Sequence, residues 1–533
     1  MDPLSPYPGL RPFDVDESHL FFGREEQTDE LLQRLHATHF LGVVGPSGCG
    51  KSSLVRAGMI AALSAGFMVA AGARWQFAIM RPESRPMHGL AKALVEQTVI
   101  GSDEADKEIA TGFLDATLRR GPLGVVEALR DTPLPADTNV LILVDQFEEI
   151  FRFEREGGSD EADAFVSLLL ETARQREVPV YVVITMRSDF FGDCAIFEGL
   201  PEALNESQYL TPRLTREQRQ AAIVGPARVF GGDVAPDLVN GLLNQMGTDP
   251  DQLPLMQHLL MRMWTWRFPP QAGADGLGTA DRAIEPRGAG RELTLADCDA
   301  VGGLDHALSR HADEAFESLD DRQKSIAETL FRILSERAPG NRDIRRPTPA
   351  GEVAELAGAS LDELVAVVEA FRAPGRSFIV PAFPEPIGPE RVLDITHESL
   401  IRQWQRLRDW AEEEEKSAED YRFLAQSASL WQRGGECAVA VTQFGDGARL
   451  AEPAAADRVV GETLWRRFRA GDDLPCGERK GEGGARGRDG GQAVVRNPSL
   501  ADGLRIGLRA GALAPSRRVD FLRGQLRRAR PVL

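Results

Sequence analysis

The feature that most constrains this chain is a glycine-rich turn between a predicted strand and a predicted helix. The apolar run Phe40 to Val44 leads into Gly45-Pro46-Ser47-Gly48-Cys49-Gly50-Lys51-Ser52, which has the spacing G-x-x-x-x-G-K-S, and helical sequence follows from Leu54. Glycines in such a turn allow successive backbone N–H groups to converge on phosphate oxygens. The following helix adds the positive end of its dipole. The turn therefore predicts a nucleoside triphosphate site.

The polar residues of this turn have expected roles. Lys51 reaches the β- and γ-phosphates, and the hydroxyl of Ser52 binds Mg²⁺. A chance match is the alternative in a chain with 52 glycines, but the strand before the turn and the helix after it argue against chance. We expect the nucleotide to contact the loop and the start of the helix, at Gly45, Ser47, Gly48, Gly50, Lys51, Ser52 and Ser53.

A second apolar run ends in carboxylates. Residues 140–144 are five consecutive apolar residues, typical of a buried parallel strand, and Asp145-Gln146-Phe147-Glu148-Glu149 follows. Open α/β sheets bind their ligands at the carboxyl ends of the strands. We expect Asp145 to hold Mg²⁺ opposite Ser52 and Glu148 or Glu149 to deprotonate the attacking water. The alternative is a solvated helix start, because acidic residues favour helix N-termini.

A third predicted strand, residues 178–186, ends in Arg187-Ser188-Asp189. An arginine at this position would face the γ-phosphate; alternatively it pairs with Asp189 or Asp145. Strands and helices alternate up to this point, which indicates an α/β fold with a doubly wound parallel sheet, as in P-loop NTPases.

After Thr215 the pattern changes to helices, the first of which we expect to run from Arg216 and to end at Gly225-Pro226. Later helices precede a predicted hairpin of residues 377–381 and 391–395, an order typical of a winged helix. The predicted domains are a lead-in (1–36), an ATPase core (37–212), a helical bundle (213–300), a winged helix (301–412), a helical extension (413–470) and a basic Gly/Arg-rich tail (471–533) that is disordered.

Composition excludes some functions. The formal net charge of −19 disfavours nonspecific binding to nucleic acid, although residues 476–533 carry 13 basic and 5 acidic side chains. The five cysteines are scattered without a C-x-x-C pair, which favours a reduced, cytoplasmic chain over a disulfide framework. The N-terminus lacks the pattern of a signal peptide, and we predict no membrane-spanning segment.

Several motifs together resemble the novel STAND NTPase 1 group, which are signal-transduction ATPases with numerous domains. The resemblance covers about residues 6–460. It rests on Pro6-Tyr7-Pro8-Gly9-Leu10-Arg11-Pro12-Phe13, Phe22-Gly23-Arg24-Glu25, the glycine-rich turn, Asp145 to Glu149, Arg187-Ser188-Asp189, Leu253-Pro254-Leu255 and Thr396-His397-Glu398-Ser399-Leu400.

The resemblance implies an AAA-related ATPase core, a helical bundle and a winged helix that close over ADP, and that open with ATP for self-association. Many relatives continue into a β-propeller, but no repeat of about 40 residues is found here. Carried over by position, the nucleotide-binding residues would also include Gly23, Arg24 and Pro254 near the adenine. Arg187 would be the first sensor arginine, and His397 would hold the winged helix on ADP. From the residues alone, His397 is equally a structural residue that caps a helix.

The favoured function is therefore a signalling switch that binds ATP or ADP with Mg²⁺, hydrolyses ATP slowly and self-associates with ATP, with an unknown signalling partner. A second hypothesis is a DNA-associated ATPase or regulator that reads DNA with its winged helix. Residues 306–409 are rich in Asp and Glu, however, whereas a helix in a DNA groove needs Arg and Lys. The third is a small-molecule kinase, for which the sequence identifies no acceptor pocket.

Overall fold

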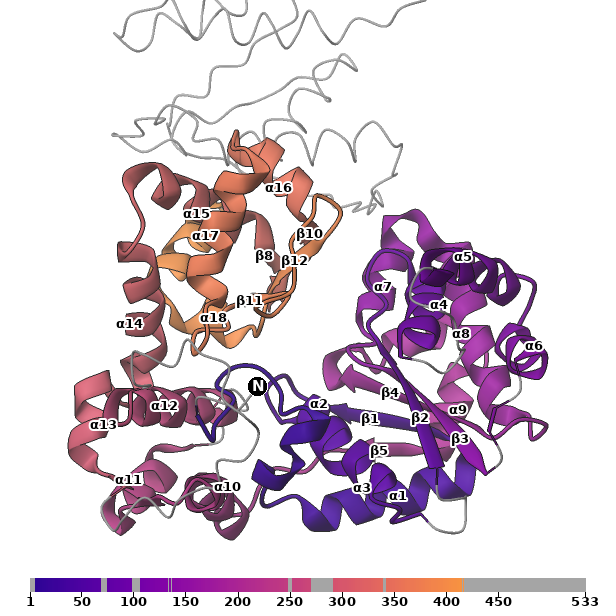
Figure 1. The fold of residues 1–533 in the computed structure, drawn as a ribbon, viewed down its shortest axis with the longest axis horizontal. Coiled ribbons are helices and arrows are strands. Elements are labelled where there is room, and N and C mark those ends of the chain that lie inside the picture. Colours follow the sequence, from indigo (N-terminus) through magenta and orange to yellow (C-terminus); the bar gives the residue numbers. More distant parts are fainter. Residues whose placement is uncertain are drawn as a thin grey trace, which may run out of the picture. The chain divides into compact units, whose positions relative to one another are not determined.

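A five-stranded parallel sheet organises the first half of the chain (Figure 1). The strand order is β2-β3-β4-β1-β5, and each neighbouring pair is parallel. The strands are β1 (Phe40–Gly45), β2 (Arg74–Met80), β3 (Thr138–Val144), β4 (Val180–Arg187) and β5 (Gln208–Leu210). The predicted parallel α/β fold is therefore confirmed.

Helices cover both faces of this sheet, and alternate residues of each strand point to opposite faces. In β1, Leu41 and Val43 pack beneath α1, η2 and α3, whereas Phe40 and Val44 belong to the larger core under the other helices. The first layer is α1 (Glu25–Thr38), α2 (Lys51–Ser53), η2 (Leu54–Ile60) and α3 (Ala61–Ser64). The second is α4 (Pro86–Glu96), α5 (Lys107–Leu118), α6 (Gly124–Asp131), α7 (Glu149–Phe153), η5 (Glu154–Gly158), α8 (Ser159–Arg174) and α9 (Leu200–Glu206).

The strand register brings three of the predicted motifs to one edge of the sheet. Gly45 pairs with Arg187 across β1 and β4, and Val144, the last residue of β3, pairs with Ile184 of β4. The glycine-rich turn Gly45 to Ser52, called the phosphate loop below, the acidic loop Asp145 to Glu149 after β3 and the turn after β4 therefore leave the sheet side by side. Short 3-10 helices connect the remaining segments: η1 (Val15–Leu20), η6 (Ser188–Phe190) and η7 (Asp193–Ile196).

A helical part follows the sheet. It contains α10 (Arg216–Val229), α11 (Pro236–Gln245), α12 (Gln252–Arg267) and α13 (Leu295–Val301), with a small parallel pair of β6 (Asp233–Val234) and β7 (Glu292–Leu293). The prediction that α10 ends at Gly225-Pro226 is wrong, because the helix continues through Pro226 to Val229. The aromatic ring of Phe22 packs against Gly225, where any side chain would collide with it.

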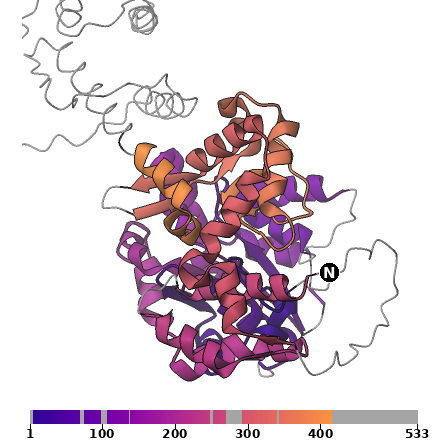
Figure 2. The same ribbon diagram turned by 90° about the vertical axis from the view of Figure 1, so that its left-hand side faces the viewer.

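We call residues 301–412 the C-terminal module. Figures 1 and 2 show this module in two views, and three of its strands form a sheet of order β10-β12-β11. The predicted hairpin is present as the antiparallel pair of β11 and β12. The elements are α14 (Gly303–Glu317), α15 (Asp321–Leu334), α16 (Ala350–Ala357), α17 (Leu361–Arg372), α18 (Ser399–Gln403), β8 (Ser335–Ala338), β9 (Arg342–Arg345), β10 (Thr348–Pro349), β11 (Ile379–Val380) and β12 (Val392–Ile395).

The computed structural model describes residues 5–68, 74–97, 106–132, 134–135, 137–247, 252–269, 291–338, 342–414 and 416. The chain divides into two units, residues 1–411 and 412–533. The predicted helical extension beyond residue 416 and the predicted basic tail lie outside the described residues. Within the described residues, no helix is both long and apolar enough to cross a membrane.

Candidate functional site

The phosphate loop has the backbone geometry that its glycines predict. Gly48 and Gly50 have φ values of 76° and 92°, in the left-handed region that glycine adopts without strain. Gly50 is the N-cap of α2, so the loop passes directly into the helix. The Nζ of Lys51 donates hydrogen bonds to the carbonyl oxygens of Gly45 and Pro46, both at 2.9 Å. The lysine charge is therefore held over the loop.

Ser52 and Asp145 meet beside the loop, as the sequence predicts. The Ser52 hydroxyl donates to Oδ1 of Asp145 at 2.8 Å, and the Thr185 hydroxyl donates to the same oxygen at 2.6 Å. Arg56 contacts the other carboxylate oxygen at 3.2 Å. The Asp145 side chain is fully buried. Two oxygen atoms that could be metal ligands, one from Ser52 and one from Asp145, are thus adjacent. This pair suits Mg²⁺, a cation that takes few protein ligands and completes its shell with water and phosphate.

The charge of Asp145 is stabilised despite its burial. Burial by itself raises the pKa of this carboxyl, but the Arg56 and Arg81 cations and the hydrogen bonds from Thr185 and Ser52 lower the pKa below its ordinary value. Asp145 is therefore an anion at neutral pH.

The two glutamates after β3 are placed differently. Glu148 lines the cavity above the phosphate loop, and its carboxylate accepts a hydrogen bond from the backbone N–H of Arg187 at 3.3 Å. Glu149 does not line that cavity, and its carboxylate accepts a hydrogen bond from the backbone N–H of Glu83 at 3.2 Å. Burial raises the pKa of Glu148 and raises the pKa of Glu149 to about 7.

Arg187 lies at the end of β4 and lines the same cavity. Its guanidinium forms an ion pair with Asp189, which is the pairing that the sequence left as an alternative. A second guanidinium nitrogen lies 3.7 Å from Oε1 of Glu398, in the C-terminal module. Arg187 Nε has no hydrogen-bond partner among the described residues.

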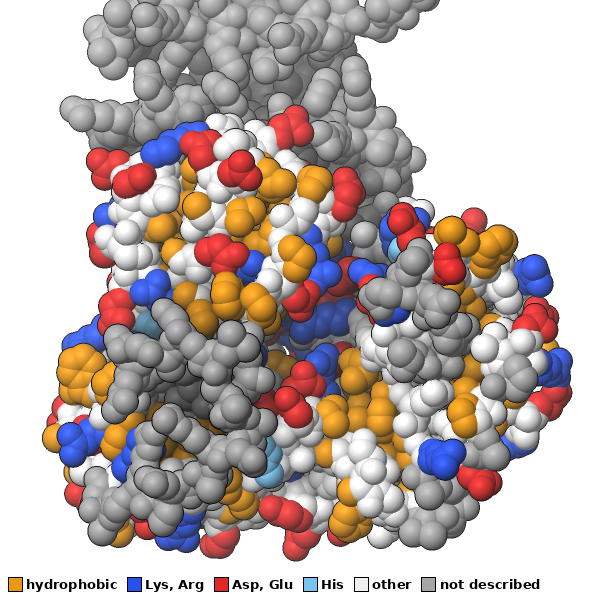
Figure 3. Space-filling model, viewed as in Figure 1, with side chains coloured by type: hydrophobic (Ala, Val, Ile, Leu, Met, Phe, Trp, Pro, Cys, Tyr) orange, Lys and Arg blue, Asp and Glu red, His pale blue; other side chains and the backbone are white. Residues whose placement is uncertain are grey.

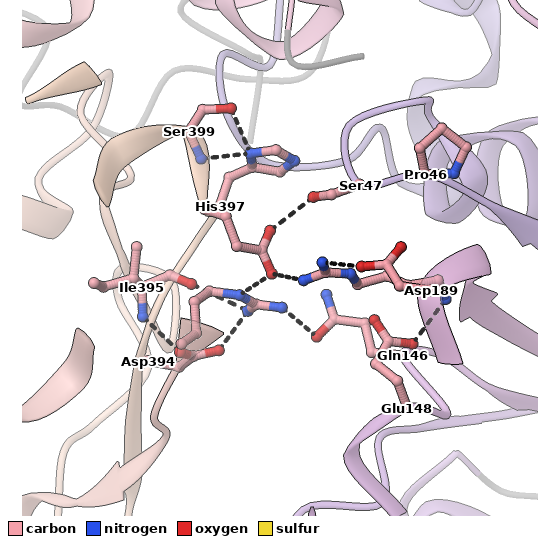
Figure 4. A network of polar contacts seen from close by, with 12 residues as sticks. Pro46, Ser47, Gln146, Glu148, Asp189, Asp394, Ile395, His397 and Ser399 are labelled. Atoms are coloured by element: carbon pink, nitrogen blue, oxygen red, sulfur yellow. Dashed lines mark hydrogen bonds and ion pairs between the residues drawn. The ribbon is translucent and has the colours of Figure 1, made fainter. Parts of the chain in front are cut away.

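Residues of the C-terminal module contact the phosphate loop and the acidic loop directly (Figure 4). The Ser47 hydroxyl donates to Oε2 of Glu398 at 3.0 Å. Arg345 donates from Nε to Glu398 at 2.9 Å and from Nη2 to the Gln146 side-chain oxygen at 3.0 Å. We call these five residues, Ser47, Gln146, Arg187, Arg345 and Glu398, the module contact.

Glu398 is the charged centre of the module contact. Its residue is only 5% exposed. Burial would raise its pKa, but Arg345, His397 and Arg187 together lower the pKa well below its ordinary value. A buried carboxylate therefore bridges the phosphate loop and two arginines, a geometry that stabilises the charge only while those partners stay in place.

His397 lines the cavity next to Glu398. Its Nδ1 accepts a hydrogen bond from the backbone N–H of Ser399 at 3.1 Å, so the proton of the neutral ring resides on Nε2. Burial lowers the pKa of His397 to about 4, helped by the Arg345 cation and opposed by Glu398. The ring is therefore neutral at physiological pH. The bond to Ser399 at the start of α18 also fits the structural role that the sequence left open.

The lead-in and the helical part form the opposite wall of the cavity. Its apolar lining includes Leu10, Phe13 and Phe22, with Leu253 and Pro254 from the start of α12. The lead-in is anchored where the Tyr7 hydroxyl donates to the carbonyl oxygen of Ile223 at 2.5 Å. An apolar wall beside a phosphate loop is the environment that a nucleobase requires.

Gly23 and Arg24 lie next to this wall with structural contacts of their own. A side chain at Gly23 would approach the Gln218 carbonyl oxygen to 2.5 Å. The buried Arg24 guanidinium donates to the carbonyl oxygens of Pro212 and Cys49 at 2.8 and 2.9 Å, so it braces the phosphate loop.

The cavity is strongly basic. Figure 3 shows the molecule in the orientation of Figure 1, with a hollow near its centre in which Lys and Arg side chains gather. Of the side chains that line the cavity, six are basic and two are acidic: Arg11, Arg24, Lys51, Arg81, Arg187 and Arg345 against Glu148 and Glu398. A site of this charge favours a polyanionic ligand.

The structure brings most of the predicted site residues to one cavity. Those that line it are Arg24, Ser47, Gly48, Gly50, Lys51, Ser52, Ser53, Glu148, Arg187, Pro254 and His397. Four predicted residues do not line it: Gly23, Gly45, Asp145 and Glu149. Asp145 nevertheless accepts a hydrogen bond from Ser52, which does line the cavity. No role is predicted from the sequence for Gln146, Arg345 or Glu398. Gln146 and Glu398 stand inside quoted motifs, whereas Arg345 has no local signal.

Similar solved structures include Cdc6p from Pyrobaculum aerophilum (13% identity, 73% of this chain, 94% of that chain, TM-score 0.31) and the ORC2 protein of Aeropyrum pernix as ADPNP–ADP complexes (12%, 73%, 92%, 0.36). Another is the Walker-type ATPase paby2304 of Pyrococcus abyssi (12%, 75%, 98%, 0.32). No curated protein sequence matches the chain.

The family model described as novel STAND NTPase 1 matches residues 6–438. This match covers most of the chain and includes the phosphate loop, the acidic loop and the C-terminal module. The chain is therefore a P-loop ATPase that belongs to the novel STAND NTPase 1 family.

Proposed function

We propose that this ATPase is a nucleotide-controlled switch for signal transduction. It binds ATP or ADP with Mg²⁺, hydrolyses ATP slowly, and couples the bound nucleotide to the position of the C-terminal module and to self-association. We further propose that the chain is organised as predicted, with modules that meet near residues 36, 212, 300 and 412, and that residues 301–412 act as a winged helix.

The observation that supports this proposal is the module contact. Glu398 accepts a hydrogen bond from Ser47 of the phosphate loop and lies 3.7 Å from Arg187. These are the groups that a γ-phosphate would use, so the phosphate and the Glu398 carboxylate compete for them. Two anions that compete for the same donors weaken each other's binding, so ATP favours release of the C-terminal module without forbidding a closed state that still holds ATP.

The remaining site residues have these proposed roles. Lys51 and the loop amides bind the phosphates, while Ser52 and Asp145 hold Mg²⁺, which neutralises phosphate charge when bound. Glu148 is the better placed of the two glutamates to accept the proton of the attacking water, because it lines the cavity. The neutral His397 ring donates its Nε2 proton to a phosphate oxygen of ADP.

The adenine lies against the apolar wall, near Pro254 and the backbone of Gly23. The buried Arg24 supports this wall and the loop together. Moving a two-state equilibrium from mostly closed to mostly open takes roughly 5.5 kcal/mol of differential affinity. A few contacts with charged groups, each contributing about 1.5–3 kcal/mol, are sufficient.

Sedimentation analysis tests the proposal. We expect a monomer with ADP and a larger assembly with a non-hydrolysable ATP analogue; equal masses in both would contradict the switch. Glu398→Gln removes the carboxylate charge and should assemble at lower analogue concentrations. The matched control is Glu355→Gln, an exposed position on α16 of the same module, which should behave as the wild type.

A further inference from the structure

We propose that Arg345 is a positioning residue for ATP hydrolysis. It extends from the C-terminal module, holds the side chain of Gln146 and thereby fixes the loop that carries Glu148. The chemical step is then fastest while the C-terminal module is in contact with the core. This inference rests on the proposed function, because it requires that the module contact opens and closes.

The first support is the backbone of Gln146. Its φ is +58°, in the left-handed region that non-glycine residues rarely occupy. The Gln146 N–H donates to the Thr185 hydroxyl at 2.9 Å, and the N–H of Phe147 donates to the Thr185 carbonyl at 2.8 Å. Strained conformations of this kind persist where surrounding contacts over-determine them, and they cluster at functional sites.

The second support is the rigid placement of Arg345. The residue is 9% exposed, and each of its three nitrogens is used. Nε donates to Glu398 at 2.9 Å, and Nη1 donates to Asp394 at 2.5 Å and to the Ile395 carbonyl at 3.1 Å. Nη2 donates to Gln146 at 3.0 Å. Because these three other contacts fix the planar guanidinium, it presents Nη2 to Gln146 in one orientation.

The consequence concerns the glutamate that follows. Gln146 is separated from Glu148 by one residue and lines the cavity with it. Loss of the Arg345 contact frees the Gln146 side chain, and the strained turn then relaxes together with the Glu148 carboxylate. Small displacements of a group that accepts a proton slow the chemical step strongly. ATP held in the open state is therefore protected, and hydrolysis accompanies closure.

A double-mutant cycle tests the proposal on the full chain: wild type, Arg345→Met, Gln146→Ala and the double variant, with single-turnover ATP hydrolysis and ATP affinity measured for each. Each single variant should lower the hydrolysis rate about tenfold, and the double variant should be no slower than the slower single variant, because both remove the same contact. In Gln146→Ala, which removes no charge from the cavity, ATP affinity should stay within about twofold of wild type, so that the loss lies in the chemical step.

Losses that multiply in the double variant, or an unchanged rate in Gln146→Ala, would overturn the proposal. Gln146→Ala leaves the ion pairs of Arg345 intact, so it decides the question if Arg345→Met fails to fold. The matched control is Arg346→Met, at the next position after β9, which should keep the wild-type rate. If the mass in sedimentation is the same with ADP and with the ATP analogue while the double-mutant cycle is non-additive, only the proposed switch is refuted. If the mass depends on the nucleotide while the losses of the two single variants multiply, only this inference is refuted.

Discussion

Lys51 is the residue on which we propose that phosphate binding depends most. Its ammonium lies 2.9 Å from two carbonyl oxygens of the loop, so the charge is held over the loop. We expect Lys51→Ala to weaken ATP and ADP binding at least about 100-fold, because charged hydrogen bonds to the phosphates are lost. Calorimetric titration measures this affinity. The control Lys92→Ala removes a half-exposed lysine on α4 that pairs with Glu96; equal affinities for both variants would contradict the assignment.

The two acidic-loop glutamates should differ in function. Glu148 lines the cavity and Glu149 does not. Replacement of the residue that accepts the proton should slow hydrolysis by about 10²–10⁴-fold while ATP binding is kept. We therefore expect that loss in Glu148→Gln and a much smaller one in Glu149→Gln. Steady-state turnover at saturating ATP separates the two, and the reverse order would place the base at Glu149.

The partly buried carboxyl of Glu149 should make stability depend on pH. Burial raises its pKa from the ordinary value of 4.5 to about 7. Between these two values the folded chain binds more protons than the unfolded chain, so stability falls as pH rises through this window. Glu149→Gln should flatten this decline. Thermal unfolding at pH values from about 4.5 to 7.5 measures it, and identical slopes for both chains would refute the pKa shift.

At the scale of elements, α10 shows how a tertiary contact overrides a local signal. Gly225-Pro226 normally interrupts a helix, yet α10 continues to Val229. The ring of Phe22, from the lead-in, lies against Gly225, and an added Cβ would come within 2.5 Å of two ring atoms. The absence of a side chain at Gly225 therefore leaves the space in which Phe22 of the lead-in packs against α10.

This contact gives a stability prediction. Gly225→Ala should destabilise the chain by about 1–3 kcal/mol, because the Phe22 ring must move. Gly112→Ala is the matched control inside α5, where nothing lies within 4 Å of the added Cβ, and it should stabilise by about 0.5–1 kcal/mol through helix propensity. The midpoint of thermal unfolding compares them, and a more stable Gly225→Ala variant would refute the packing argument.

Several elements of the site could be predicted because their signals are local. The phosphate loop, the strand before Asp145 and the strand before Arg187 each combine an apolar run with polar residues at its carboxyl end. Parallel strand ends meet at one edge of a sheet, so these motifs converge without any knowledge of the rest of the fold. The pairing of Gly45 with Arg187 confirms this convergence.

The module contact could not be predicted, because it depends on separations of hundreds of residues. Arg345 stands in a stretch with several arginines, and nothing in its neighbours distinguishes it from Arg346. Only the folded chain brings it to Gln146, 199 positions away. Glu398 follows His397, a predicted nucleotide-binding residue, directly in the sequence. Its hydrogen bond with Ser47, however, joins residues 351 positions apart.

At the scale of the whole molecule, the cavity is made by parts that are far apart in the sequence. The lead-in, the phosphate loop, the start of α12 and the C-terminal module all line it. A ligand that contacts every wall stabilises the arrangement in which the walls are together, and a ligand that displaces one wall favours separation. This is the physical basis for the proposed difference between ADP and ATP.

The central claim is that the bound nucleotide controls the module contact, and hydrogen exchange tests it most directly. The amides of residues 392–403, which include β12, His397 and α18, should exchange slowly with ADP and Mg²⁺. With a non-hydrolysable ATP analogue they should exchange at least about tenfold faster, because local opening precedes exchange. The strands β3 and β4 should remain equally protected in both. Equal exchange of residues 392–403 with the two nucleotides, both shown to be bound, would contradict the account.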